Sequence, residues 1–439
     1  MSTTSNPAAK LVVVTVLVGV GAGLGGMLLA LLLHAVQHVA FGYSVDSLPG
    51  KESFLQGISS ASPQRRFIVL TLCGVIGGGG WWLLYRFGKP LVSVADAIKA
   101  DGPRMPPAST VANSLLQIVT VAMGSPLGRE VAPREIGALW AGWLAHYAKL
   151  TPAQARIMMA CGAGAGLAAV YNVPLGGAVF VLEVLLATFE ARIVVAALLT
   201  SAIGAFVAWI GLGDAQTYRL PVYSLDAQLI VWAVVTSPLF GAAARLFVKF
   251  TKAARANAAR GTSLPVLLIL NFMLVGALVI YYPQLAGNGK SAAGLSFEDH
   301  LGSALAGVLL VLKVIIEVSS LRAGAQGGLM TPSLTNGALL GVVLGSVWNG
   351  FWPGTPLGAF AVIGAAAFLA SAMQMPLTAL VLTLEFTNIE QGFLIPLALA
   401  IAGAMMTFRA LGETRPASAL APATAPAPAP AQGLHGVSD

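Results

Sequence analysis

The sequence predicts an all-α polytopic membrane protein built from two related halves, and three observations support this prediction. Of its 439 residues, 57% are hydrophobic and only 9% are charged, whereas soluble proteins carry about 25% charged residues. Apolar runs recur along the whole chain, and several reach the ~20 residues that a helix needs to cross a bilayer. Motifs in the first half of the chain also reappear, in the same order, in the second half.

The apolar runs give the predicted spans in chain order. The first run continues to Leu33 without a break. This is longer than the ~7–15-residue apolar core of a signal peptide, so we expect a retained span. Between residues 106 and 190, glycines and prolines divide the chain into pieces that we expect to be too short to cross singly. The predicted spans are 11–33, 67–84, 193–210, 229–248, 264–282, 301–316 and 392–408.

Charged residues gather in short loops. The formal net charge of +7 is spread over these loops, which does not indicate a nucleic-acid partner. The loops at 86–104 and 249–260 are basic, so the positive-inside rule places them in the cytoplasm. The segments 43–66 and 212–228 are mixed in charge, and we expect them to be external.

The cysteines and the chain ends carry no predicted site. Cys73 and Cys161 both lie inside apolar segments, which favours small buried side chains over a disulfide or a metal pair. Residues 1–10 form a short N-terminal tail. Residues 412–439 include APATAPAPAPA, which lacks the apolar residues of a core and should be disordered. We expect both termini to be cytoplasmic.

The repeat is clearest around two Pro-Leu motifs. NVPLGGAVFVLE (172–183) and QMPLTALVLTLE (374–385) each end in a glutamate nine residues after the proline, Glu183 and Glu385. CGAGAGLAA and IGAAAFLAS precede them at the same offset of 202 residues. The predicted membrane halves are residues 11–212 and 227–411. Such repeats mark transporter folds whose substrate site lies between the halves and is built from broken helices.

A second repeated motif predicts an anion site. GREVAP (128–133) and GGLMTP (327–332) are both G-x-x-x-x-P. Gly128 allows the backbone to approach a ligand closely, and Pro133 suits a first helical turn. The nearby amides would then be unpaired donors at a helix N-terminus, which is an anion site. Leu329 and Met330 would offer a second set of amides.

The charges of GREVAPREIGA allow two interpretations. A carboxylate on Glu130 would compete with a permeating anion until it is protonated or moves away, and Arg129 would offset its charge. An intramembrane ionisable residue is a functional hypothesis by default. Alternatively, Arg129–Glu130 and Arg134–Glu135 are ion pairs in a surface loop.

These motifs resemble those of the CLC chloride channels and chloride/proton antiporters, over about residues 11 to 411. GREVAP is similar to the family's GREGP motif and GGLMTP to its GxFxP motif. LKVIIEVSSLRAGAQGG (312–328), with the intramembrane Lys313, resembles the helix before the latter. The resemblance implies a CLC-like fold of two inverted halves with broken and re-entrant helices. It also implies a homodimer in which each subunit has its own pore.

The resemblance assigns roles to residues. Glu130 would be the external gate and proton site, and the amides of Leu329 and Met330 would line the central anion site. VSVAD (92–96) is the best match to the family's GSGIP motif, which makes Ser93 the central serine. The anion-binding residues that we expect are Ser93, Gly128, Arg129, Val131, Leu329 and Met330.

Three departures from the family pattern bear on proton coupling and on the shape of the path. The family's proton-relay glutamate falls at Val184, which leaves Glu183, one residue away, as a possible relay. The tyrosine that closes the inner side of the anion site falls near Ala417. The second glycine of GREGP is also lost. We therefore expect chloride transport by weakly proton-coupled antiport, with a passive chloride channel as the alternative.

Other functional classes have weaker support. An intramembrane metalloenzyme would need a metal cluster, and His34 and His38 lack the glutamate of H-E-x-x-H. GAGLGG (21–26) lies inside an apolar run, which indicates close helix packing rather than phosphate binding. We therefore expect no enzymatic activity and no cofactor. We expect an integral protein of a prokaryotic inner (plasma) membrane, with the lipid bilayer, a small anion and possible protons as its partners.

Overall fold

The computed structural model describes residues 7–42, 53–99, 102 and 104–412, and these residues are helical almost throughout. Gly128 and Gly328 form an isolated antiparallel bridge, and the same part of the chain contains no named strand. The α-helices are α1 (Pro7–Phe41), α2 (Phe54–Ser60), α3 (Pro63–Phe87), α4 (Val94–Ala97), α5 (Pro107–Ala122), α6 (Val131–Tyr147), α7 (Pro152–Tyr171), α8 (Pro174–Phe180), α9 (Ala191–Leu212), α10 (Ala227–Ala256), α11 (Ser263–Tyr281), α12 (Lys290–Phe297), α13 (Ser303–Ala323), α14 (Met330–Asn349), α15 (Leu357–Met373), α16 (Pro376–Thr387) and α17 (Leu394–Ala410). Three short segments join them, the π-helix η1 (Val181–Leu185) and the 3-10 helices η2 (Pro283–Leu285) and η3 (Gln391–Phe393).

The predicted spans all appear as helices. Across the described residues, nine helices are long and apolar enough to cross a membrane. Seven of them cover the predicted apolar runs, namely α1, α3, α9, α10, α11, α13 and α17. The all-α prediction and the order of these spans are therefore confirmed.

The other two, α7 and α14, were missed by the sequence analysis. Their mean hydropathy is 1.2, against 1.6 to 2.5 for the other seven. Over the 18-residue stretch compared in each helix, 67% of α7 and 72% of α14 is buried inside the protein, against 39–44% of the other seven helices. Helices that face protein rather than lipid need fewer apolar side chains. The expectation that 106–190 holds only pieces too short to cross is therefore wrong for α7.

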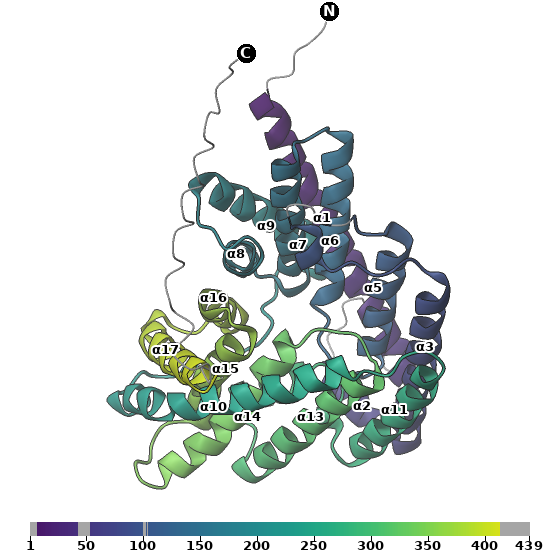
Figure 1. Cartoon of the computed structure of the whole chain (residues 1–439). Coiled ribbons are helices and arrows are strands. Elements are labelled where there is room, and N and C mark those ends of the chain that lie inside the picture. The colour runs from purple at the N-terminus through teal and green to yellow at the C-terminus, as the bar shows by residue number, and fades with distance from the viewer. Residues whose placement is uncertain (1–6, 43–52, 100–101, 103, 413–439) are drawn as a thin grey trace, which may run out of the picture.

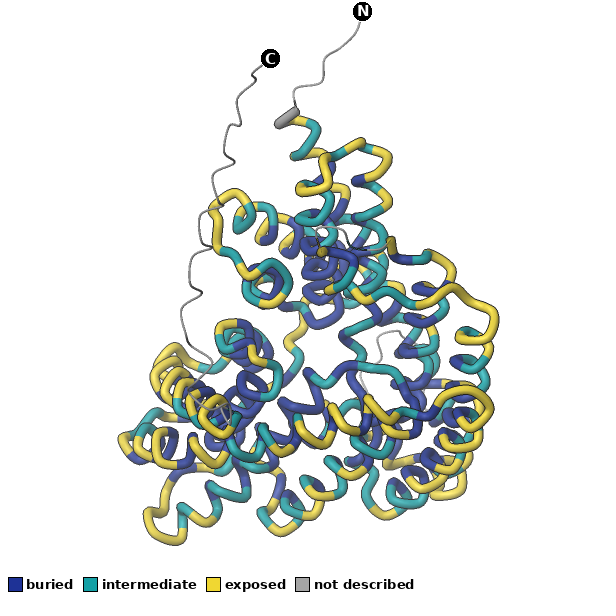
Figure 2. Tube along the Cα trace, in the orientation of Figure 1, coloured by how far each residue is buried: buried dark blue, intermediate teal, exposed yellow. Residues whose placement is uncertain are grey.

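Buried residues gather where these central helices pack, and exposed residues lie on the outer helices (Figure 2). The packing of the first half repeats in the second. α6 packs on α7 as α14 packs on α15, and α1 packs on α7 and α9 as α10 packs on α15 and α17. The two groups lie on either side of α8 and α16, which are neighbours (Figure 1).

The backbone also repeats itself where each central helix breaks. The residue that caps the end of α7 is Asn172, with φ 54° and ψ 52°, and the one that caps the end of α15 is Gln374, with φ 54° and ψ 45°. Both lie in the left-handed region, and a proline two residues later begins the next helix in each half. The same left-handed turn followed by proline thus breaks both halves.

The two glutamates of the Pro-Leu repeat exchange contacts. The carboxylate of Glu183 accepts the amides of Leu377 (2.9 Å) and Thr378 (2.7 Å) at the start of α16. In return, the carboxylate of Glu385 accepts the amides of Leu175 (2.9 Å) and Gly176 (2.6 Å) at the start of α8. The start of each segment lies beside the end of the other, so these equivalent segments are antiparallel. This is the arrangement of inverted halves.

Glycines allow the close packing that the sequence predicted for GAGLGG. A side chain at Gly23 would contact the backbone of Gly204 in α9, and one at Gly26 would contact Ala169 in α7. The prediction of helix packing for this motif is confirmed.

Candidate functional site

The two repeated loops meet where α6 and α14 begin. The amide of Gly128 donates to the carbonyl of Gly328 (2.8 Å), and the amide of Gly328 donates back to the carbonyl of Gly128 (2.9 Å). This bridge joins the two halves and fixes both loops beside the N-terminus of α14. It also occupies the amide of Gly128, so this amide is not a free donor to an anion.

The carboxylate of Glu130 lies inside this junction. Its Oε1 accepts the amide of Met330 at 2.7 Å, and the side chain is fully buried. A Cβ atom on Gly128 or on Gly328 would overlap the carboxylate, so both positions need glycine in this arrangement. Its Oε2 has no hydrogen-bond donor among the described residues. A carboxylate therefore occupies the anion position at the start of α14.

Arg129 and Tyr171 tie this junction to both halves. The guanidinium of Arg129 donates to the carbonyl of Val170 (3.5 Å) and lies 5.0 Å from the centre of the Tyr171 ring. The Tyr171 hydroxyl hydrogen-bonds the hydroxyl of Thr331 (3.0 Å), one residue after Met330. Sequence reasoning missed Tyr171, although its place at the end of α7, next to a repeated motif, was a usable signal.

The four charges of GREVAPREIGA do not form the two surface ion pairs of the alternative interpretation. Arg134 donates to the backbone carbonyl of Glu130 (2.9 Å) and lies over the Phe180 ring. The carboxylate of Glu135 accepts from the side chains of Asn113 (3.1 Å) and Ser114 (3.2 Å). The surface-pair interpretation is therefore wrong, since three of the charges hold the loop and Glu130 fills the site.

A cation borders the junction on the predicted cytoplasmic side. Arg255, at the end of α10, donates to the carbonyl of Gly327 (3.0 Å), one residue before the glycine bridge. From the sequence, Arg255 indicates only membrane orientation, because nothing in its spacing connects it to the second loop.

Ser93 lies at the N-cap of the short helix α4 and is exposed. Its hydroxyl accepts the amide of Asp96 (3.1 Å) and donates to the Asp96 carboxylate (2.7 Å). Hydrogen bonds from Lys99 and then from Ser93 hold the pKa of the Asp96 carboxyl below its usual range. Within the described residues, no hydrogen bond links Ser93 to the Glu130 junction.

The remaining candidates are placed as follows. Leu329 is the N-cap of α14 and Val131 is the first residue of α6, so both begin the helices that meet at Glu130. Glu183 caps α16 with both oxygens, and Val184 is 40% exposed. Ala417 lies outside the described residues.

A metal centre has no geometric support in the described part of the chain. No three His, Cys, Asp or Glu side chains come together there as a metal site. His34 and His38 lie one turn apart on α1. Cys73 and Cys161 are both buried and unpaired.

Comparison with known proteins identifies the family of the chain. The sequence profile described as "Voltage gated chloride channel" matches residues 65–409. Relatives include a putative chloride channel protein ClcB-like from Ralstonia nicotianae, 29% identical over 386 residues and covering 83% of this chain and 87% of the relative. Another is the voltage-gated ClC-type chloride channel ClcB of Shigella flexneri, 30% identical over 353 residues, 76% of this chain and 82% of the relative.

Solved structures share the fold. A slow cyanobacterial Cl⁻/H⁺ antiporter aligns with a TM-score of 0.80 at 18% identity, over 92% of this chain and 95% of that one. A CLC-type fluoride/proton antiporter aligns with a TM-score of 0.72 at 20% identity, over 92% and 96% of the two chains. At these identities the likeness shows the arrangement of helices.

Proposed function

The chain belongs to the voltage-gated chloride channel family, and from this premise we propose that it transports chloride in exchange for protons, with Glu130 as the gate. The observation that supports this most directly is the Glu130 carboxylate on the amide of Met330. A chloride ion that binds this amide needs the position that the carboxylate holds.

Protonation of Glu130 provides the exchange step. A protonated carboxyl is neutral and binds the N-terminus of α14 less strongly than a carboxylate does, since the helix dipole favours negative charge. Chloride can then take the amide of Met330, and loss of the proton returns the carboxylate and expels the anion. We propose that the amides of Leu329 and Val131, which begin the same two helices, complete the anion site, while Gly128 and Arg129 hold the loop.

The proton route from the cytoplasm is the weaker part of the exchange. A valine cannot accept a proton, and both oxygens of Glu183 already accept hydrogen bonds from backbone amides at the start of α16. We therefore propose that Glu183 is not the relay and that coupling is weak. Passive chloride conduction is the second candidate, and Val184 is the observation that favours it.

Simultaneous measurement of chloride and proton movement tests the proposal. Purified full-length protein in liposomes, with a chloride gradient and the membrane potential clamped, should release chloride and take up protons. Glu130→Gln should abolish proton uptake and leave chloride release nearly independent of pH. Chloride release without any proton movement against a gradient would establish the channel instead, and absence of anion flux would reject both.

We further propose a homodimer in a prokaryotic inner (plasma) membrane with cytoplasmic termini. The bacterial relatives and the basic loop at the end of α10 support this location. Light scattering of the purified protein with detergent mass subtracted should give twice the mass of one chain, and a mass of one chain would contradict the dimer.

A further inference from the structure

A second buried carboxylate lies in the interior of α13. Glu317 and Lys313 are one helical turn apart, and both side chains are fully buried. In a membrane helix such residues are costly and commonly belong to ion or proton pathways. Neither residue takes part in the gate described above, so the pair needs its own explanation.

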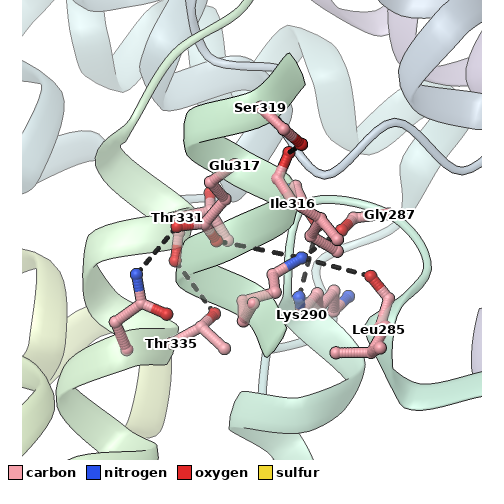
Figure 3. Close-up of polar contacts among 11 residues, drawn as sticks. Leu285, Gly287, Lys290, Ile316, Glu317, Ser319, Thr331 and Thr335 are labelled. Atoms are coloured by element: carbon pink, nitrogen blue, oxygen red, sulfur yellow. Dashed lines mark hydrogen bonds and ion pairs between the residues drawn. The ribbon is translucent and has the colours of Figure 1, made fainter. Parts of the chain in front are cut away.

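Lys313 is bound mainly to the backbone rather than to the carboxylate. Its ammonium donates to the carbonyls of Gly287 (2.6 Å) and Leu285 (3.3 Å), in the segment that faces α13 (Figure 3). The Glu317 carboxylate lies 4.0 Å from the same nitrogen, which is beyond hydrogen-bond range. The two residues are therefore an ion pair without a direct hydrogen bond between them.

The Glu317 carboxylate faces α14 with its other oxygen. Oε2 accepts the side-chain amide of Asn336 at 2.8 Å. Oε1 of Glu317 and Oδ1 of Asn336 are both buried acceptors without a donor among the described residues. Buried polar atoms nearly always have a partner, and each exception calls for an explanation. A proton carried by Glu317 would turn one of these acceptors into a donor.

The first turns of α14 connect this carboxylate to the gate. Met330 binds Glu130, and Asn336 binds Glu317. Six residues of helix span about 9 Å. Between them Ser333 is fully buried, and its hydroxyl has no partner in the described chain. Ser333 lies three residues from each end, a spacing that places neighbours on adjacent parts of one helix face, and a hydroxyl both accepts and donates hydrogen bonds.

The charges around Glu317 are few. α10, α11 and α14 all pack against α13. Asn271 of α11 donates to Ser320, Asn336 is the contact from α14, and the ammonium of Lys313 lies 4.0 Å from the Glu317 carboxylate. Burial therefore disfavours an ionised Glu317, and the neighbouring Lys313 charge favours it.

We propose that Glu317 is a second proton-binding residue of the transport cycle, which exchanges protons with Glu130 along the first two turns of α14. This inference rests on the proposed chloride/proton exchange. In it, Glu317 provides the proton-accepting carboxylate that is missing at Val184. One proton passes from water to Glu317 and on to Glu130, and no other atom is transferred. Lys313 acts as a positioning residue, which holds the pair against the 285–287 segment.

The test compares proton uptake with chloride release for variants of full-length protein in liposomes. In Glu317→Gln the ratio of protons to chloride should fall at least about tenfold, as expected for loss of a proton-transfer group, while chloride release continues. Glu317→Asp should keep a measurable part of the coupling. Glu298→Gln, which changes a partly exposed glutamate that pairs with His300 outside both sites, serves as the matched control and should match wild type.

A purely structural role predicts a different result. It would reduce chloride and proton fluxes in parallel and leave their ratio unchanged, and this outcome would overturn the proposal. If Glu317→Gln fails to fold, the double variant Lys313→Met/Glu317→Gln removes both charges together. Its ratio of protons to chloride then tests the proposal. Wild-type protein that moves chloride without protons would overturn the exchange mechanism itself, whereas coupling that survives in the glutamine variants would overturn only the role of Glu317.

Discussion

Glu130 and the two glycines beside it act as one unit. The carboxylate can lie on the amide of Met330 only because neither Gly128 nor Gly328 has a side chain. Its place was predicted from the repeat, since both copies keep a glycine before the helix start. The bridge between the glycines could not be predicted, because sequence spacing does not show which backbone groups pair across the two halves.

Gly328→Ala should hold the gate open. The new methyl group would overlap the end of the Glu130 side chain, which is flexible and can move away. Chloride release should therefore lose most of its pH dependence and approach that of Glu130→Gln. Gly79→Ala is the matched control, since a Cβ atom there would meet nothing within 4 Å. Unaltered pH dependence in folded Gly328→Ala would show that the carboxylate does not need this position.

Ser93 and Asp96 allow a second residue-scale prediction. The Ser93 hydroxyl donates to Asp96, so an anion at this serine must compete with a carboxylate that is ionised at neutral pH. If Ser93 contributes to anion binding, Asp96→Ala should raise the preference for chloride over nitrate, and Ser93→Ala should lower it.

The ratio of chloride transport to nitrate transport, measured in liposomes, decides between the two roles of Ser93. Equal chloride-to-nitrate ratios in wild type, Ser93→Ala and Asp96→Ala would leave Ser93 as a helix cap only. The match of VSVAD to the first family motif would then be wrong.

At the scale of elements, the exchanged caps of α8 and α16 explain both glutamates of the repeat. Each carboxylate accepts two amides at the start of the opposite helix, where the helix dipole favours a negative charge. The equal spacing of proline and glutamate predicted that Glu183 and Glu385 are equivalent. Their exchange depends on the antiparallel arrangement of the halves, which the spacing alone does not contain.

These caps predict matched effects of two substitutions. Glu183→Gln and Glu385→Gln should each lower stability by about 1 kcal/mol, because each loses charge-assisted hydrogen bonds to a helix start. Both should keep the wild-type ratio of protons to chloride. Thermal unfolding in detergent and the two-ion liposome assay measure the two quantities. Loss of coupling in Glu183→Gln alone would instead identify Glu183 as a proton relay.

At the scale of the whole molecule, the apolar runs predicted the outer helices better than the central ones. Runs that face lipid are strongly apolar, so their positions follow from composition. α7 and α14 are surrounded by protein and have the lowest hydropathy of the nine candidate spans in the described chain. The two loops of the candidate site were predicted from the repeated motif, whereas Arg255 reaches the second loop through a tertiary contact that no local motif records.

In the proposed mechanism, the junction of the halves also links chloride binding to pH. The first half supplies the carboxylate on the amide of Met330, which belongs to the second half, so chloride bound at this amide and ionised Glu130 would exclude each other. A proton on Glu130 removes the competitor, and chloride should therefore bind more tightly as the pH falls. By linkage, chloride binding must favour proton uptake to the same degree.

Calorimetric titration of purified protein with chloride measures this coupling directly. Between alkaline and acidic buffer, the dissociation constant should fall by at least about tenfold, within the usual range of coupling between sites. Glu130→Gln should bind chloride with the tight, acidic-buffer affinity in both buffers, because its side chain is neutral throughout. If the variant keeps the wild-type pH dependence, another group controls access to the amide.

Because Glu317 does not contact this amide, Glu317→Gln should keep the pH dependence of chloride binding while losing coupled transport. This result would separate occupancy of the anion site from delivery of the proton.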